Sequence, residues 1–460
     1  MPFMTLLLIA LAACKPSEAP LDTSEPAPQT VPWSGELPSL DAELGKIRGL
    51  TPQRSIIHLH SPWSHDACDG DPNPEGQVNE PCLQDLRDAL CRTRVDNAFV
   101  TDHPTLAAFQ DYEDLFHQRQ GDEWVDVGGA HRANLIHCEN GHDVLYMPGI
   151  EDELMPVSLD SHVAATPDEN DRIYNNSDAE SMGGLLASGA AVLMAHTEGR
   201  DLAHLENMQD LGLTGIEIFN LHAMFAPDIR ADDLGLDGFG WITDIQPFTS
   251  PDATGEPDLM VLGVLQDQPP SLEKWDALLQ RGPMTGVGGT DAHQNVIPLD
   301  LRDDERGDSY RRMLRWFSNV LLVDGEGPDA AQAAIEASRL YVAFEILGTP
   351  KGFDLYLDDG STKHEMGSSP ASGGTLHVGC PEVSPSSPQG LMAPEILVEV
   401  YKNGVVWQTE CGDFETDGDG VYRVQVDIIA HHLYDFFGED PEAWLKPFPW
   451  IRSNAIRVGL

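Results

Sequence analysis

The chain has 460 residues, and its 76 acidic and 27 basic side chains give a formal net charge of −49 at pH 7. This charge repels nucleic acid and anionic lipid, which excludes binding to either by electrostatic attraction. A solvated acidic surface, as in a saline habitat, is a simpler interpretation than a specific cationic partner. Apolar residues make up 41% of the chain, enough for buried cores, and the length predicts two domains.

The first residues predict export. Met4–Ala13 reads MTLLLIALAA, an apolar run of signal-peptide length that is too short to span a bilayer. Its end, Leu-Ala-Ala followed by Cys14, resembles the bacterial lipoprotein signal, although no Lys or Arg precedes the run. The resemblance implies a signal peptide over 1–13, lipidation of Cys14 and attachment to the cell envelope, and Lys15 is compatible with the outer membrane. The alternative is a buried N-terminal helix with a chance cysteine. Residues 14–40 are rich in Pro and Ser and predict a tether.

Six further cysteines fit an oxidising compartment. An even number of cysteines in an exported protein favours disulfides. Their connectivity is open; we expect Cys380 with Cys411 first and Cys68 with Cys82 next. The six are Cys68, Cys82, Cys91, Cys138, Cys380 and Cys411.

Residues 41–348 alternate short apolar runs with helical patterns. Apolar residues at three-and-four spacing predict helices around Leu83–Leu90, Leu272–Leu279 and Tyr310–Phe317. Strands that alternate with helices indicate a parallel sheet, and seven such strands favour a (β/α) barrel over an open sheet. The predicted strands are Ser55–His60, Asn97–Thr101, Val144–Pro148, Ser161–Ala165, Ala190–Ala195, Gly215–Phe219 and Met284–Gly289.

Residues 349–460 have a different pattern. Short alternating stretches predominate, and Asn403-Gly404 and Asp419-Gly420 are hairpin signals. We expect a small antiparallel β-sandwich here, with the domain boundary near Gly348–Gly352. Its predicted strands are Phe353–Leu357, Leu376–Val378, Ile396–Tyr401, Tyr422–Ile428 and Ala455–Val458.

Histidines and acids gather at the ends of the predicted barrel strands. The carboxyl ends of barrel strands open on one face, so these side chains should converge there. A single histidine is usually an ordinary core or surface residue, and some of the 17 histidines fall here by chance. The whole set is harder to explain in that way. Its members are His58, His60, His65, Asp102, His103, Glu151, His162, His196, Asp291 and His293.

The spacing of these residues has a physical reason. Side chains alternate between the two faces of a strand, so His58-Leu59-His60 places both imidazoles on one side. Asp291 and His293 repeat this geometry. Two such pairs and a bridging carboxylate can hold two or three closely spaced divalent ions. Imidazole and carboxylate ligands suit zinc, manganese or iron.

In order along about three hundred residues, this set resembles the polymerase-and-histidinol-phosphatase (PHP) metallohydrolases. Their hallmarks are an HxH, a following Ser with His or Asp, a TDH, a GxE, a later His, an AH and a DxH. The resemblance implies a distorted (β/α)7 barrel with up to three ions. It assigns His58, His60, Glu151 and Asp291 to the first ion, Glu151, His162 and His196 to the second, and His65, His103 and His293 to the third.

Two segments depart from the family pattern. The glycine that normally follows the serine motif closely is displaced here to Gly70, so Asp66 is an alternative ligand to His65. The C-terminal segment resembles the sandwich of the carbaryl-hydrolase-like branch, but Ala455 replaces the proline of its final motif.

The predicted activity is hydrolysis of a small-molecule ester or phosphoester by a water that two ions acidify. Asp102 is expected to orient a ligand or to act as a capping carboxylate. Arg200 and His222 are candidate substrate contacts, or ordinary loop residues. The predicted function is a phosphoesterase; the alternatives are a carboxylic or carbamate ester hydrolase, an amidohydrolase-type barrel, and a surface-binding lipoprotein with an inert barrel.

Overall fold

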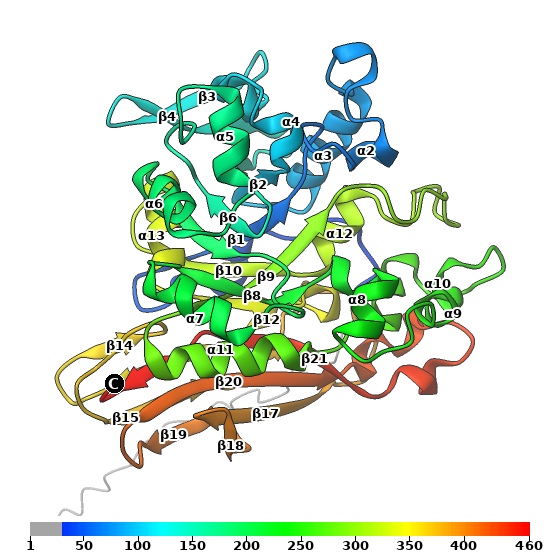
Figure 1. The fold of residues 1–460 in the computed structure, drawn as a ribbon. Coiled ribbons are helices and arrows are strands. Elements are labelled where there is room, and N and C mark those ends of the chain that lie inside the picture. The colour runs from blue at the N-terminus through cyan, green and yellow to red at the C-terminus, as the bar shows by residue number, and fades with distance from the viewer. Residues whose placement is uncertain (1–29) are drawn as a thin grey trace, which may run out of the picture.

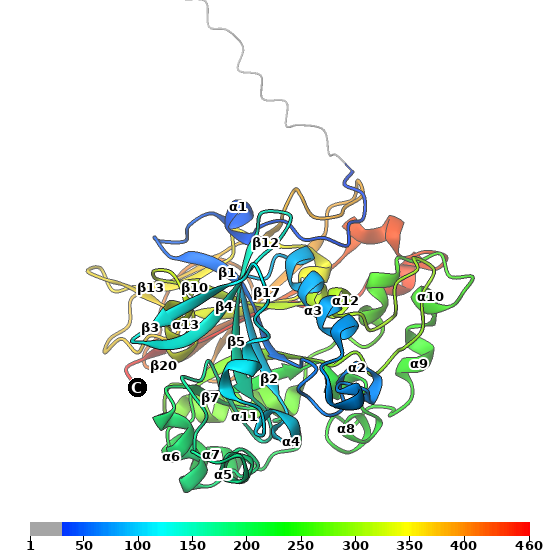
Figure 2. The same ribbon diagram turned by 90° about the horizontal axis from the view of Figure 1, so that it is seen from above.

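Seven strands form the centre of the molecule (Figures 1 and 2). The structure is a computed structural model that describes residues 30–460, so the predicted signal peptide and Cys14 lie outside the described residues. In pairing order the strands are β6 (Leu154–Val157), β7 (Ala191–Met194), β8 (Gly215–Asn220), β9 (Thr285–Ala292), β1 (Thr51–Leu59), β2 (Asn97–Asp102) and β5 (Asp143–Ile150). All neighbours in this series pair in parallel except β6 and β7, which are antiparallel.

These strands curl around a shared interior. Buried side chains from six of them pack into one cluster, which includes Ile57, Phe99, Met147, Met155, Leu193 and Val287. Alternate residues of a strand face the same side, so one face of the curled sheet fills this core. No ladder joins β5 to β6 in the described part of the chain. The predicted α/β architecture is therefore present, while the closed (β/α)7 barrel is reproduced only in part.

One predicted strand is wrong. Residues 161–165 form no strand, and the chain pairs with β7 through β6, a few residues earlier. Pro156 lies within β6, opposite Val192. Proline cannot donate to a ladder and is tolerated at a sheet edge, and β6 pairs with β7 alone. Because Pro156 interrupts the apolar run, the sequence pattern does not predict this strand.

The helices predicted from apolar spacing are present. They are α3 (Glu80–Arg92), α11 (Pro269–Arg281) and α12 (Tyr310–Trp316). The Asn79 side chain caps α3 by accepting from the Cys82 amide, and Ser309 caps α12 in the same way. Other helices are α1 (Leu40–Leu44), α2 (Ala67–Gly70), α4 (Pro104–Ala107), α5 (Pro167–Tyr174), α6 (Ala179–Ala187), α7 (Leu202–Asp210), α8 (Pro227–Asp232), α9 (Trp241–Asp244), α10 (Gln246–Thr249) and α13 (Pro328–Glu336). No helix in residues 30–460 has the length and apolar character needed to cross a bilayer.

The C-terminal strands are antiparallel, as expected. β10 (Ser318–Val323) and β11 (Leu340–Ala343) extend the sheet from β1, and β21 (Pro447–Ser453) pairs with β11. The sheet then continues through β20 (Gly420–Ile429), β17 (Glu395–Lys402) and β18 (Val405–Gln408), with β22 (Ile456–Val458) beside β20. A hydrogen-bonded ladder therefore crosses the predicted domain boundary. Figure 1 shows α11 between β8 and β20, both of which it contacts.

Smaller sheets complete the molecule. One contains β14 (Lys363–Glu365), β13 (Asp354–Asp358), β15 (Thr375–Gly379) and β19 (Gly412–Glu415); a second pairs β12 (Pro350–Lys351) with β16 (Glu382–Val383). The strands β3 (Glu123–Val127) and β4 (Ala130–His137) extend the main sheet beyond β5. At the start of the described residues Val31 bridges to Gln389, so this end of the predicted tether lies against the fold.

Three disulfides connect the six cysteines. Cys380–Cys411 and Cys68–Cys82 are the two pairings expected from the sequence, and Cys91–Cys138 is the third.

Candidate metal centre

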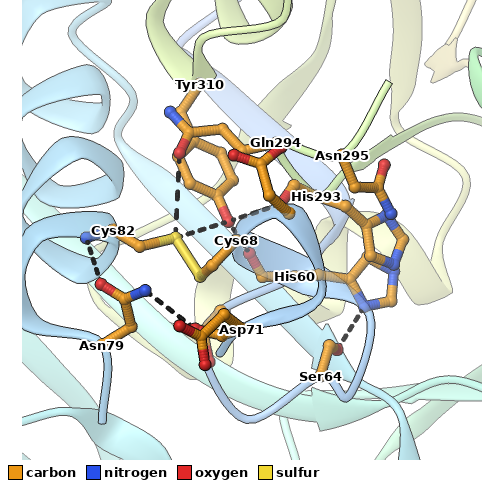
Figure 3. The surroundings of a disulfide bond; sticks show 12 residues. His60, Ser64, Cys68, Asp71, Asn79, Cys82, His293, Gln294, Asn295 and Tyr310 are labelled. Atoms are coloured by element: carbon orange, nitrogen blue, oxygen red, sulfur yellow. Dashed lines mark hydrogen bonds between the residues drawn. A yellow bond between two sulfur atoms is a disulfide. The ribbon is translucent and has the colours of Figure 1, made fainter. Parts of the chain in front are cut away.

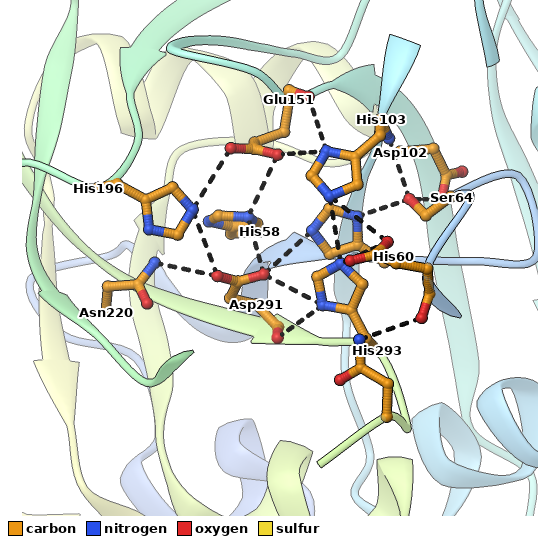
Figure 4. A network of polar contacts seen from close by, with 12 residues as sticks. His58, His60, Ser64, Asp102, His103, Glu151, His196, Asn220, Asp291 and His293 are labelled. Carbon is orange, nitrogen blue, oxygen red and sulfur yellow. Dashed lines mark hydrogen bonds and ion pairs between the residues drawn. The ribbon is translucent and has the colours of Figure 1, made fainter. Parts of the chain in front are cut away.

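Eight of the nine predicted ligands belong to candidate metal groups at one end of the curled sheet; His65 lies at the exposed edge, and the other seven form the core (Figure 4). They come from the carboxyl ends of β1, β2, β5, β7 and β9, or from the residues that follow directly. Most are almost completely buried, although about a fifth of the His103 side chain and a quarter of the His196 side chain remain exposed. The seven are His58, His60, His103, Glu151, His196, Asp291 and His293.

Asp291 and Glu151 link the histidines of the centre. Asp291 Oδ1 lies 3.3 Å from His58 Nε2 and 3.2 Å from His60 Nε2, and Asp291 Oδ2 lies 3.4 Å from His196 Nε2. Glu151 Oε1 lies 3.5 Å from His196 Nε2. Ligands held about 2.1 Å from one tetrahedral ion are roughly 3.4 Å apart, so these spacings fit ligands that share a cation.

A further group lies beside these residues. His103 Nε2 and His293 Nε2 face one another at 3.4 Å. Asp66 Oδ1 lies 3.3 Å from His293 Nε2 and 3.6 Å from His103 Nε2. His65 is exposed, yet one of its ring nitrogens can share an ion with Asp66 and His103. Both alternatives from the sequence therefore lie within reach, and Asp66 reaches deeper into the cluster.

Several ligand atoms lack hydrogen-bond partners in the described residues. His58 Nε2, His60 Nε2 and Asp66 Oδ1 are buried atoms of this kind. A buried polar atom without a partner is costly, and several that converge on one point are explained by cations that bind them. The residues present therefore fit a cluster of divalent ions.

The charges of the centre are strongly coupled. Burial lowers the pKa of His58, but the carboxylates of Asp291 and Glu217 outweigh burial and raise it well above its usual value. Burial likewise lowers the pKa of His103, but its hydrogen bond to Glu151 prevails and raises the value to about 9. For Glu151, burial raises the pKa, but the surrounding histidines hold it well below its usual range. The same field that favours protonated imidazole favours a bound cation.

The backbone is strained where it presents the ligands. His58, His196 and Asp291 have φ angles of 65°, 50° and 51°, in the left-handed region that non-glycine residues rarely adopt. The ladders of β1 shift register between Ile57 and Leu59, as at a β-bulge. Such irregularities redirect a side chain at the end of a strand, and each left-handed residue costs about 1–3 kcal/mol. Strain at three ligands supports a functional role for this end of the sheet.

Glu217, in β8, is a buried residue of the centre that the sequence analysis did not assign. Its Oε1 lies 2.6 Å from His58 Nδ1, and its Oε2 accepts from the His196 amide at 2.8 Å and from Asn220 Nδ2 at 2.9 Å. A carboxylate on the far nitrogen of a histidine ligand fixes its tautomer and orientation. Gly289 leaves the room for it, because a Cβ there would lie 1.8 Å from Glu217 Oε1. The only sequence signal was an acid inside an apolar strand.

Asp102 contacts the histidine ligands indirectly: it forms hydrogen bonds to two serines, and one of these, Ser64, contacts the ligands. Its carboxylate accepts from the Ser61 amide and hydroxyl, both at 2.6 Å, and from the Ser64 hydroxyl at 3.0 Å. Ser64 Oγ in turn lies 2.7 Å from His60 Nδ1 and accepts from the His103 amide. Asp102 therefore positions ligands through serine.

Three predicted residues lie outside the cluster. His162 is engaged at both ring nitrogens, by the Tyr174 hydroxyl and by the Gln110 carbonyl, each at 3.0 Å. The expectation that it ligates the second ion is therefore corrected, because neither nitrogen is directed at the centre. Arg200 pairs with Glu153. His222 lies closer, with its ring 6.1 Å from that of His196, and burial lowers its pKa.

No protein-family model matches the chain, and no curated protein matches it. Among solved structures it is similar to a two-domain protein from Bacteroides vulgatus containing a predicted PHP-like metal-dependent phosphoesterase. The two share 12% identity with a TM-score of 0.35, over 86% of this chain and 96% of that chain. It is also similar to PsfC from Pseudomonas syringae, with 14% identity and a TM-score of 0.32, over 62% of this chain and 87% of that chain.

Proposed function

We propose that the protein is a metal-dependent hydrolase, and that phosphoesters are its substrates. One observation carries this proposal: metal-ligating side chains from five strand ends converge, and among their buried ligand atoms His58 Nε2 and His60 Nε2 have no hydrogen-bond partner in the described residues. Divalent ions bound there would acidify a water and neutralise negative charge on the substrate. The ordered series of motifs, which resembles that of the PHP metallohydrolases, supports the same reaction class.

The protein's own residues supply orientation in this proposal. Glu217 holds the proton on His58 Nδ1, which leaves Nε2 free as a ligand. Ser64 does the same for His60, and Glu151 holds His103 through Nδ1 at 2.8 Å. Fixed imidazoles and buried carboxylates keep the reacting groups in place without reorganisation during the reaction.

The basic side chains nearby are already engaged. Arg200 pairs with Glu153, and Lys274 Nζ donates to the carbonyls of Thr197 and Glu198, each at 2.7 Å. In this proposal the ions neutralise the phosphate in place of arginine or lysine. Overlapping ligand groups side by side suit the several oxygens of a phosphoryl group.

A second candidate function is hydrolysis of a carboxylic or carbamate ester at the same centre. It is favoured by a narrow recess that Asp291 and His222 border. The remaining walls are mainly apolar and include Leu221, Phe225, Ile297, Met313 and Trp316. The recess has a volume of about 20 Å³, so it could take only a small apolar group of an uncharged ester.

Metal analysis and a substrate panel test these proposals together. We expect two or three divalent ions per purified chain, and hydrolysis of p-nitrophenyl phosphate or its bis ester faster than that of p-nitrophenyl acetate. The reverse order would favour the second candidate. Less than one ion per chain would refute both and leave a binding lipoprotein as the function.

We also propose attachment to the cell envelope through Cys14, on the basis of the apolar run that precedes it. Fractionation should find the protein with membranes, and Cys14→Ser should release it in soluble form. A soluble wild-type protein would contradict this.

A further inference from the structure

The loop that follows β1 brings Asp66 back to the metal centre. Its Oδ1 is a buried atom 3.3 Å from His293 Nε2, with no hydrogen-bond donor in the described residues. The side chain as a whole is 39% exposed, so packing around it is loose. The position of Asp66 therefore depends on the backbone of its own loop.

Several contacts fix this backbone just after Asp66. The amides of Cys68 and Asp69 donate to the carbonyls of His293 and Gln294, each at 2.9 Å, and Asn295 Nδ2 donates to the Asp66 carbonyl at 3.1 Å. Cys68 and Asp69 have φ angles of 56° and 60°. L-residues rarely adopt this region, so two in succession need an outside constraint.

The disulfide Cys68–Cys82 supplies that constraint (Figure 3). Both cysteines are buried, and Cys82 lies in the first turn of α3. Helix α3 packs against α12, where the Tyr310 hydroxyl lies 2.9 Å from the His60 carbonyl and 3.3 Å from the His293 carbonyl, as a donor to them. The disulfide thus ties the Asp66 loop to the same buried unit that holds the backbone of two ligands.

We propose that Cys68 and Cys82 are positioning residues whose disulfide holds Asp66 in place as a ligand of the ion bound by His103 and His293. The inference rests on the proposed metal centre and goes beyond it by making one ion dependent on a covalent crosslink. The group formed by His58, His196 and Asp291 takes no ligand from this loop, so its ion is independent of the crosslink.

The chain offers a matched control on the same helix. Cys91–Cys138 ties the last turn of α3 to the residue that follows β4, away from the ligand loop. The test compares the Cys68→Ser/Cys82→Ser protein with the Cys91→Ser/Cys138→Ser protein. Each is loaded with Zn²⁺ and dialysed against a chelator of graded strength, and ions per folded chain are counted by mass spectrometry, with circular dichroism to verify the fold.

Loss of the first disulfide should weaken the binding of one ion per chain by about 10–100-fold, the range found when groups that orient a ligand are removed. The control should keep the wild-type ion count. The Asp66→Ala protein should lose the same ion, and adding the Cys68→Ser/Cys82→Ser pair to it should cause no further loss.

Unchanged zinc retention without Cys68–Cys82 would overturn the inference, and so would equal loss in the control or further loss in the Asp66→Ala background. In each case the number of zinc ions per folded variant is compared with that of the zinc-loaded wild-type protein. A wild type that binds no zinc is a separate result, which would overturn the proposed function and the inference together.

Discussion

Replacing Glu217 by glutamine removes one negative charge beneath His58 and leaves the shape of the side chain almost unchanged. Two of its contacts, the His196 amide and Asn220 Nδ2, are donors to Oε2. The glutamine oxygen must take over that side to satisfy both donors, which turns the NH₂ group toward His58 Nδ1. His58 then has to accept at Nδ1 and carry its proton on Nε2, the atom that faces Asp291 and the ion.

A protonated Nε2 cannot bind a metal until the tautomer is reversed at the expense of a hydrogen bond. We therefore expect Glu217→Gln to weaken zinc affinity by about 10–100-fold, equivalent to about 1.4–2.8 kcal/mol. Competition with a fluorescent chelator of known affinity measures this directly. In the metal-free protein Glu217 also forms a buried pair with His58, whose pKa it helps to raise, so the melting temperature of the variant should fall as well. Gly289→Ala should disturb the same carboxylate by steric overlap and should also weaken metal binding.

Glu345→Gln is the matched control, because it replaces another buried carboxylate far from the centre. Glu345 pairs with Arg54 at 2.8 Å through both oxygens. Breaking a buried pair costs about 3–5 kcal/mol, so this variant should melt at a lower temperature with unchanged zinc affinity per folded chain. Wild-type affinity in Glu217→Gln, or equal loss in Glu345→Gln, would refute the tautomer argument.

Three further predictions test the centre and its surroundings. His58→Ala should abolish hydrolysis and lower the ion count, and an unchanged rate would show that the site is misassigned. His162→Ala should keep the wild-type ion count in the same mass measurement, since Tyr174 and Gln110 already engage its ring; loss of an ion would restore it as a ligand. Burial, and then the charge of Asp258, raises the pKa of Glu256 from 4.5 to about 7. Ionising this group therefore destabilises the fold as pH rises from 4.5 through 7, so Glu256→Gln should raise the melting temperature at pH 8 and not at pH 4.5. An equal change in melting temperature at pH 4.5 and pH 8 would contradict the prediction that ionised Glu256 destabilises the fold.

The local sequence pattern was sufficient to predict those strands, helices and ligands that follow a regular spacing of residues. The run that contains His58 and His60 became β1, and the helix predicted around Leu83–Leu90 became α3. A residue's place along a strand decides which end of the sheet it occupies, because parallel strands share their direction. For this reason residues far apart in sequence, such as His60 and Asp291, could be assigned to one centre.

Features set by neighbours distant in sequence were missed. Strand β6 was misplaced because only its pairing with β7 identifies it, and the ladder between β11 and β21 had no signal in either strand. His162 and Glu217 show the same limit within the site. His162 follows the motif order, yet its ring points to Tyr174, and Glu217 follows no motif, yet it lies against His58.

The amino-acid sequence by itself determined the class of site: imidazoles and carboxylates at successive strand ends, in numbers suited to divalent ions. Tertiary structure decided which of them share an ion, which carboxylate supports them, and which disulfide lies beside them. The reason is physical, since strand periodicity acts over a few residues, whereas coordination requires atoms within a few ångströms whose positions depend on bulges, strained φ angles and packing of the whole sheet.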